Sequence, residues 1–166
     1  MTMPLAVGAA APDFELPELD GGVVRLREWL AGGPVVVVFF KTTCPTCMLA
    51  FPFLERLHQR ARGLRVLAVS QDGVEATRRF HDDFEITLPT VMDAAATGYA
   101  VSDAYGITHV PSLFLVSGGM GEGAVVGGKV EWFSTGFSKP ELEELGERVG
   151  VAVFGVQDRV PVWKPG

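Results

Sequence analysis

The feature that most constrains the fold is a continuous apolar run, Val35–Phe40 (VVVVFF), which is followed within a few residues by Cys44 and Cys47. A run without a polar face predicts a central strand that other layers cover on both sides. From residue 45 to about residue 62, apolar residues recur at spacings of three and four, which indicates a helix. A buried strand leading into a helix is typical of layered α/β domains, so the thiols are expected at the turn between these elements.

Strand and helix signals also alternate along the rest of the chain. The segment 12–26 predicts a hairpin around a Gly-Gly turn, and Ser138 followed by Glu141 predicts the capped start of a last helix. The other expected strands lie at 64–70, 112–117 and 128–137, and the other expected helices lie at 74–84, 97–107 and 138–150. The pattern predicts one α/β domain over residues 1–166.

The pattern is weak in two segments. Residues 118–128 are so rich in glycine that we expect a mobile loop at the tip of a hairpin. Residues 151–166 contain no periodic run, which predicts an irregular tail.

Length and composition limit the possible roles of the cysteines and the possible partners. A chain of 166 residues can bury roughly 70% of its unfolded surface, so it needs no disulfide for stability and its two cysteines are free for chemistry. The net charge of -6 and the lack of a Lys/Arg cluster argue against nucleic acid or an anionic membrane as partner. Neither a signal peptide nor an apolar run of about 20 residues is visible, which predicts a cytoplasmic protein, or a periplasmic one if a leader was removed.

The positions of the thiols predict different roles for them. Cys44 is expected at the tip of the helix and Pro45 in its first turn, where unpaired N–H groups and the positive end of the helix dipole stabilise a thiolate. Cys47 falls one turn further on the apolar face, so it should be shielded yet within disulfide distance of Cys44. Such a pair fits two-step exchange, in which Cys44 attacks a disulfide and Cys47 resolves the mixed disulfide.

Other uses of a C-x-x-C motif are possible. A zinc site would need more ligands, but His58, His81 and His109 are scattered without ligand-like spacing. Haem attachment would need a histidine where this chain has Met48. Inert core cysteines remain an alternative, because free cysteine is often simply buried.

The order of these motifs resembles a known family. The stretches APDFELPELDGGVVRLREWL, PVVVVFFKTTCPTC, YGITHVPSLFLV and GKVEWFSTGFSKPELEEL are similar to the TlpA-like redoxins of the thioredoxin superfamily, which border on AhpC/TSA peroxiredoxins. The resemblance implies a thioredoxin-like three-layer sandwich, a central mixed sheet flanked by helices, with an N-terminal hairpin extension. It also implies a cis peptide bond before Pro111 and pairing of the Val110 backbone with an extended substrate. The substrate-contacting residues that it implies are Thr43, Pro45, Thr46, Val110 and Pro111.

The chain departs from the family pattern around the thiols. Thr43 replaces the usual tryptophan, and Val38 and Ala50 stand where many relatives have a carboxylate that could accept the proton of Cys47. Asp72 is a candidate substitute for that base, although a loop aspartate is more often a turn former. Lys41 is a candidate for stabilising the thiolate of Cys44, although a solvated lysine is the simpler interpretation.

The sequence leaves more than one function open. The leading prediction is a thiol–disulfide oxidoreductase that uses Cys44 and Cys47 on protein disulfides or dithiols, with a thioredoxin-type protein as candidate reductant, as a monomer or weak dimer. The chemistry would need no metal and no organic cofactor. A peroxidase with Cys44 as the reacting thiol is the alternative, but Lys41 stands where peroxiredoxins carry Thr or Ser. A binding module that kept the fold without efficient chemistry is a further alternative.

Overall fold

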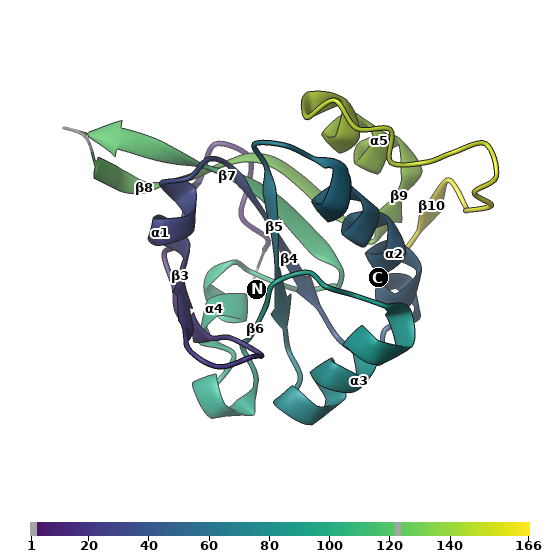
Figure 1. Ribbon diagram of the computed structural model, residues 1–166. Helices are drawn as coiled ribbons and strands as arrows, with labels where there is room; N and C mark the ends of the chain where they lie inside the picture. Colours follow the sequence, from purple (N-terminus) through teal and green to yellow (C-terminus); the bar gives the residue numbers. More distant parts are fainter. Residues whose placement is uncertain (1–2, 122–123) are drawn as a thin grey trace.

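The computed structural model describes residues 3–121 and 124–166, and within them a six-stranded sheet forms the centre of the molecule (Figure 1). Its strands are, in spatial order, β1 (Ala10–Ala11), β8 (Ala124–Thr135), β7 (Ser112–Gly121), β4 (Val35–Phe40), β5 (Arg65–Ser70) and β6 (Thr90–Met92). β4 pairs parallel with β5 and antiparallel with β7, so the sheet is mixed. This agrees with the predicted fold class.

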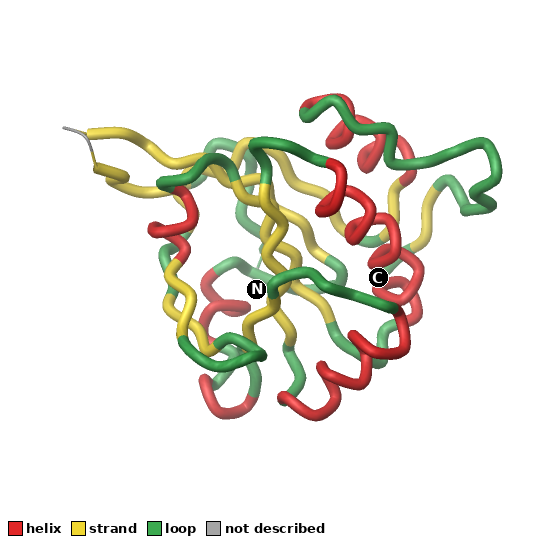
Figure 2. The backbone as a smooth tube through the Cα atoms, viewed as in Figure 1, coloured by secondary structure: helices red, strands yellow, loops and turns green. Residues whose placement is uncertain are grey.

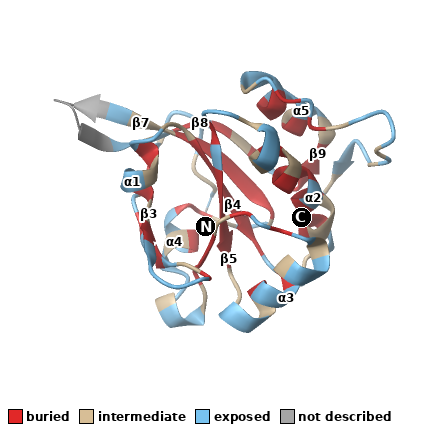
Figure 3. Ribbon diagram, in the orientation of Figure 1, coloured by how far each residue is buried: buried red, intermediate tan, exposed pale blue. Residues whose placement is uncertain are grey.

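The apolar run occupies the position expected for it. Every residue of β4 is buried, and buried residues follow β4 and β5 through the middle of the molecule (Figure 3). Val36, Val38 and Phe40 belong to a core cluster on one face of the sheet. Their neighbours Val35, Val37 and Phe39 belong to a cluster on the opposite face. A strand packed on both faces requires this continuous apolar pattern.

Helices cover both faces of the sheet (Figure 2). α2, α3 and α5 contribute to the core cluster around Val36, whereas α1 and the hairpin of β2 and β3 contribute to the opposite one. Their bounds are α1 (Leu26–Leu30), α2 (Pro45–Arg60), α3 (Val74–Phe84), the 3₁₀ turn η1 (Ala95–Thr97), α4 (Ala100–Ala104), α5 (Lys139–Arg148), β2 (Glu15–Pro17) and β3 (Val23–Arg25). The predicted N-terminal hairpin and the long helix after Cys44 are thus confirmed. α1, β1 and β6 are short elements that the sequence pattern did not predict.

The last helix begins as its sequence predicts. Ser138 is the N-cap of α5, and its hydroxyl accepts a hydrogen bond from the backbone N–H of Glu141 at 3.3 Å. The carboxylate of Glu141, however, accepts a hydrogen bond from the hydroxyl of Ser134. The cap therefore also ties α5 to β8.

The prediction of a loop at residues 118–128 is wrong for the part that the structure describes. β7 and β8 remain paired through Gly118↔Gly128 and Gly119↔Gly127, and pairing continues to Gly121↔Ala124. Backbone hydrogen bonds need no side chains, so pairing that starts between the buried parts of these strands extends into the glycines. The hairpin projects from the body of the sheet (Figure 1). Its predicted tip at 122–123 lies outside the described residues.

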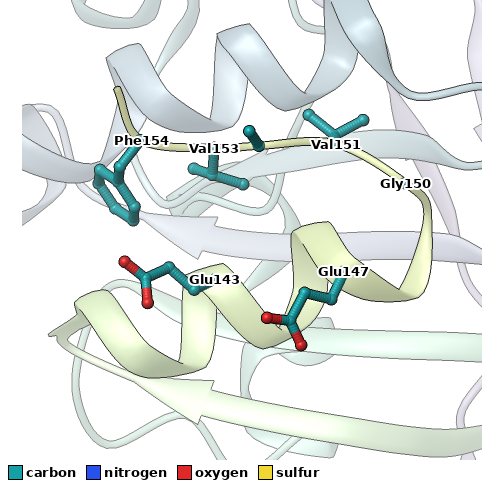
Figure 4. A pocket seen from close by; sticks show the side chains of 7 residues that line it. Glu143, Glu147, Gly150, Val151, Val153 and Phe154 are labelled. Atoms are coloured by element: carbon teal, nitrogen blue, oxygen red, sulfur yellow. The ribbon is translucent and has the colours of Figure 1, made fainter. Parts of the chain in front are cut away.

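The tail is more ordered than its sequence indicates. Val151 and Val153 are buried in the core, and residues 150–154 run beside α5, where they border a hollow of about 400 Å³ (Figure 4). After an irregular segment, β10 (Trp163–Lys164) pairs antiparallel with β9 (Phe137–Ser138). Residues 151–162 form no helix or strand, as expected of an irregular tail, and β10, whose partner lies far away in the sequence, departs from that expectation.

Candidate active site

The turn between β4 and α2 presents Cys44 as the N-cap of the helix. The Cys44 sulfur accepts a hydrogen bond from the backbone N–H of Cys47 at 3.2 Å, and the Cys44 N–H donates to the carbonyl of Lys41 at 3.3 Å. Pro45 occupies the first helical position, where its missing N–H leaves no bond unmade. Cys44 is partly exposed. The geometry therefore places this sulfur at the positive end of the helix dipole with access to solvent.

Cys47 has the opposite surroundings. It is 0% exposed and packs in the core cluster with Ala50, Phe51 and Leu54. Burial, followed by its interaction with the Cys44 side chain, raises the pKa of the Cys47 thiol well above its ordinary value. The two sulfurs are not joined by a disulfide bond in this structure. One thiol thus faces solvent while the other, one turn away, is kept protonated and sheltered.

The loop before β7 completes the surface around Cys44. The Val110–Pro111 peptide bond is cis, as the resemblance implies. The thiol of Cys44 donates to the carbonyl of Val110 at 3.4 Å, although the two residues are 66 positions apart. The carbonyl of Pro111 accepts a hydrogen bond from the Gly136 N–H at 2.9 Å. The sheet order explains this contact between distant residues, because the last residue of β4 and the first residue of the antiparallel β7 lie at the same end of the sheet.

Asp72 fixes the turn that carries Cys44. Its carboxylate accepts hydrogen bonds from the backbone N–H of Thr42 at 2.7 Å and from the Thr42 hydroxyl at 2.8 Å. A carboxylate with such bonds anchors residues 41–44 against the end of β5. Lys41 is exposed, as a solvated lysine would be. The roles suggested for Lys41 and Asp72 as modulators of the thiols stay predictions.

The remaining predicted contact residues differ in exposure. Thr43 and Pro45 are exposed beside Cys44. Thr46 is only 3% exposed, and its hydroxyl donates to the carbonyl of Pro165 at 2.6 Å. Its role as a substrate contact stays a prediction, and in this structure its hydroxyl is bonded to the tail. The side chain of His109 is exposed and lies 3.1 Å from the hydroxyl of Thr108.

Carboxylates that are buried in the described part of the chain serve other purposes than proton transfer to Cys47. Val38 and Ala50, the positions where the family resemblance leads one to expect an acid, are apolar and packed in the core. Glu55, further along α2, accepts hydrogen bonds from Thr87, Leu88 and Gln59. Burial alone would raise the pKa of Glu55, but these hydrogen bonds outweigh it and hold the pKa below its ordinary value. Glu55 is therefore an ionised anchor for the segment before β6.

Asp93 serves as a second anchor of this kind. Its carboxylate accepts hydrogen bonds from the hydroxyl of Thr97 and from the backbone N–H of Ser102, both at 2.6 Å. It is fully buried at the end of β6. These bonds fix η1 and the start of α4.

Hollows flank the turn of Cys44. One of about 480 Å³ is bordered by Lys41, Asp72 and Tyr99, and one of about 180 Å³ lies between Thr43 and α3. Thr43, next to Cys44, lines both hollows. Within residues 3–121 and 124–166, no group of three or more His, Cys, Asp or Glu side chains is arranged to hold a metal ion. No helix in the described part of the chain is long and apolar enough to cross a membrane.

Comparisons with known proteins agree with this geometry. Over 113 residues, the chain is 35% identical to the thiol-disulfide oxidoreductase ResA of Halalkalibacterium halodurans, which covers 66% of this chain and 62% of ResA. It is also 35% identical over 95 residues to the methylamine utilization protein MauD of Paracoccus denitrificans, covering 57% of this chain and 47% of MauD. The chain thus spans about three fifths, or less, of the length of these relatives.

Solved structures are similar over more of the chain. The crystal structure of a putative thiol:disulfide interchange protein DsbE from Chlorobium tepidum has a TM-score of 0.71 and 27% identity, and covers 90% of this chain and 99% of that chain. A secreted disulfide oxidoreductase of Mycobacterium tuberculosis has a TM-score of 0.61 and 19% identity, covering 82% and 94%. The latter likeness shows the fold alone.

The match to a family model covers β4, α2 and both thiols. It extends over residues 7–120, from just before β1 to near the end of β7. That span includes Cys44, Cys47 and the cis peptide bond before Pro111. The chain belongs to the AhpC/TSA family.

Proposed function

We propose that this chain is a thiol–disulfide oxidoreductase that exchanges electrons between its own Cys44–Cys47 pair and disulfides or dithiols of protein partners. The observation that carries the proposal is the asymmetry of the pair, a partly exposed sulfur that caps a helix and a fully buried sulfur one turn away. The backbone of Val110 beside the exposed sulfur adds a place for an extended partner segment. The names of the ResA and DsbE relatives point to the same chemistry.

In the reducing direction, the reaction has two exchange steps. The Cys44 thiolate attacks one sulfur of the partner's disulfide, an S–S bond forms between Cys44 and that sulfur, and the partner's other sulfur leaves as a thiolate and takes up a proton. Cys47 then loses its proton and attacks the Cys44 sulfur, which closes the Cys44–Cys47 disulfide and releases the partner's second thiolate. Two electrons pass to the partner. A thioredoxin-type dithiol is the class of reductant that would restore the pair.

The second exchange step determines how the rate of the reaction depends on pH. Because burial raises the pKa of Cys47, its thiolate is scarce near neutral pH. Breaking the mixed disulfide should therefore become faster as pH rises. Asp72 is the candidate base from the sequence, but its carboxylate is bonded to Thr42.

A thiol peroxidase is the second candidate, and membership of the AhpC/TSA family favours it. In that case the Cys44 thiolate would attack a peroxide oxygen, the O–O bond would break, and the other oxygen would leave as water or an alcohol. Cys47 would then condense with the resulting sulfenic acid to give a disulfide and a molecule of water. The exposed Lys41 occupies the position where peroxiredoxins carry the hydroxyl that orients the peroxide. This weakens the peroxidase proposal relative to disulfide exchange.

The two candidates are separated by comparing reduction of insulin disulfides with consumption of hydrogen peroxide by the same purified protein. The proposal expects dithiothreitol-coupled insulin reduction well above background and slow peroxide consumption. Fast peroxide consumption without insulin reduction would favour the peroxidase. Absence of both would favour a binding module.

We also propose that sulfur alone carries the chemistry, without metal or organic cofactor. Support comes from the described residues, where potential ligands are dispersed. Elemental analysis of protein purified without added metal should find no stoichiometric zinc. The cytoplasmic location stays a prediction, with a location outside the cytoplasm as its alternative. Cell fractionation with immunodetection would decide between them.

A further inference from the structure

The tail is anchored midway along α2 before it returns to the active site. The guanidinium of Arg56 on α2 donates to both carboxylate oxygens of Asp158, at 2.7 and 3.4 Å, and to the carbonyl of Val153 at 2.7 Å. Asp158 also accepts a hydrogen bond from the backbone N–H of Gly155 at 2.6 Å. A bidentate pair of this kind fixes position and direction. The segment after Asp158 is therefore held close to α2.

The four residues 163–166 then lie across the surface beside Cys44. β10 pairs with β9, and the carbonyl of Pro165 accepts the hydroxyl hydrogen of Thr46, the residue between the cysteines. Gly166 lies so close to Val110 that a methyl group in place of its hydrogen would overlap the Val110 carbonyl. The chain ends beside the start of α2 (Figure 1).

A second close approach places this segment against the end of β8. Gly136 has φ +71°, and a Cβ atom there would lie 2.6 Å from the carbonyl oxygen of Lys164. The backbone of 164–166 therefore passes over a glycine at the end of β8. The same Gly136 bonds to Pro111, so the tail and the loop of Val110 share a support.

We infer that residues 163–166 form an internal strap over the edge on which an extended segment of a partner protein would dock, so that the partner must displace the strap to pair with Val110. The inference rests on the proposed exchange with protein partners. The strap touches Thr46 and Val110, which flank the sulfur of Cys44. A small disulfide or alkylating reagent needs only the sulfur, whereas an extended polypeptide needs the edge as well.

The strap is held weakly enough to be displaced. Trp163 and Val162 are 60% and 67% exposed, and β10 consists of two residues. Val156, in the segment that joins the anchor to the core, is fully exposed. Short, exposed segments with few buried contacts open at low cost in free energy. Asp158 keeps the base of the strap attached while its tip opens.

The test compares the intact chain with a variant that lacks residues 163–166. Its first readout is the rate at which reduced Cys44 reacts with iodoacetamide and with a maleimide carried on a large polymer, located by mass spectrometry. If the strap is displaced in about a tenth of the molecules, the deletion should speed the reaction with the polymer-linked maleimide about tenfold. The reaction with iodoacetamide should become less than about twofold faster. This readout does not depend on any exchange activity.

Its second readout is kcat/KM for insulin and for a small aromatic disulfide. The deletion should raise the value for insulin by a similar factor and leave the small disulfide nearly unchanged. The substitution Asp158→Asn, which weakens the anchor, should give a smaller rise, and Asp82→Asn at an exposed position of α3 is the matched control with no rise expected. Circular dichroism and thermal melting establish that each variant is folded, and Asp158→Asn carries the test if the deletion does not fold.

The outcomes distinguish the inference from the function on which it rests. An intact chain that reduces insulin, with both variants unchanged in bulky labelling and in kcat/KM, overturns the strap alone. A drop in kcat/KM on deletion also overturns it, because the tail would then belong to the partner's docking surface. Faster bulky labelling in a chain that reduces no disulfide would support the strap and overturn the proposed exchange.

Discussion

The N-terminal turn of α2 and the middle of the same helix give their polar groups opposite surroundings: the Glu55 carboxylate is buried and hydrogen-bonded, whereas the Cys44 sulfur is partly exposed. In the middle, the carboxylate of Glu55 accepts hydrogen bonds from Thr87 N–H and hydroxyl at 2.6 Å, Leu88 N–H at 3.0 Å and Gln59 at 2.8 Å. At the N-terminal turn, the sulfur of Cys44 has two such contacts, at 3.2 Å to Cys47 N–H and 3.4 Å to the Val110 carbonyl. Glu55 is buried, whereas Cys44 remains partly open to solvent.

This difference teaches what separates an anchor from a reactive group on one scaffold. An ion whose acceptor capacity is filled by fixed donors stabilises the fold, and its reaction with other molecules is suppressed. Sulfur is a weak hydrogen-bond acceptor, so the contacts of Cys44 orient it without occupying it. The same helix therefore provides rigidity at Glu55 and reactivity at Cys44.

Replacing the cysteines should give the largest effect. Cys44→Ser should lower disulfide reduction by more than about 1,000-fold, because the attacking sulfur is lost. Cys47→Ser should leave attack intact and accumulate covalent mixed disulfides, because the resolving thiol is missing. Insulin reduction and non-reducing gel electrophoresis measure the two results. If Cys47→Ser turns over as well as the parent, the division of roles is wrong and a one-cysteine peroxidase mechanism is favoured.

The next largest effect is a difference in alkylation rate between Cys44 and Cys47 in the unmodified protein. Because Cys47 is buried and its pKa is raised, iodoacetamide at pH 7 should label Cys44 about 100-fold faster than Cys47. Raising the pH increases the thiolate fraction of Cys47, so the ratio should fall as the solution becomes alkaline. Peptide mapping by mass spectrometry follows both sites. Faster labelling of Cys47 would reverse the assignment.

Removing the charge of the anchor should affect stability instead of chemistry. Glu55→Gln should lower the free energy of unfolding by about 2 kcal/mol at pH 7, since hydrogen bonds to an ion are replaced by bonds to an amide. Urea denaturation measures this, with Glu75→Gln on the exposed face of α3 as the control. A loss of disulfide reduction at unchanged stability would mean that Glu55 acts in the chemistry after all.

The same variant has a predicted pH dependence. The folded-state pKa of Glu55 lies below its ordinary value. Its stabilising contribution is therefore complete above the unfolded pKa of about 4.3 and is lost as pH falls through the lower folded pKa. The stability difference between parent and Glu55→Gln should narrow below about pH 4. A difference that grows on acidification would contradict the sign of the pKa shift.

The smallest effect is expected at Asp72. Asp72→Ala removes the acceptor for Thr42 and should slow insulin reduction about three- to tenfold by loosening the turn. Asp72→Asn keeps an acceptor oxygen and should recover most of the rate. If Asp72 instead takes the proton of Cys47, Asn should be as slow as Ala, and the slow step should be release of the mixed disulfide.

Local patterns in the sequence predicted much of the fold. The apolar run of β4, the spacing along α2 and the cap of α5 at Ser138 each reflect forces that act between near neighbours. The roles of Cys44 and Cys47 as exposed and buried thiols follow from the same spacing. The cis bond before Pro111 needed the resemblance, because no local pattern reveals it.

The contacts that the sequence did not predict join distant segments. Thr46 and Pro165 are 119 positions apart, and Arg56 and Asp158 are 102 apart. Polar pairs of this kind have no periodicity, and their side chains are those of ordinary surface residues. The sequence marks Asp72 as a candidate base, but its hydrogen bonds to Thr42 depend on how the ends of β4 and β5 align. The prediction of a loop at residues 118–128 is wrong because glycine content does not reveal whether the backbone pairs with another strand.

The mixed sheet also determines when the site comes into existence during synthesis. Cys44 leaves the ribosome 66 residues ahead of Val110, and the strand after Val110 needs β8 as its other neighbour. A nascent chain that has emerged only as far as α3 thus carries both thiols without the Val110 carbonyl that contacts the Cys44 sulfur. The sheet around the site is therefore complete only after the chain has emerged to about residue 135, where β8 ends.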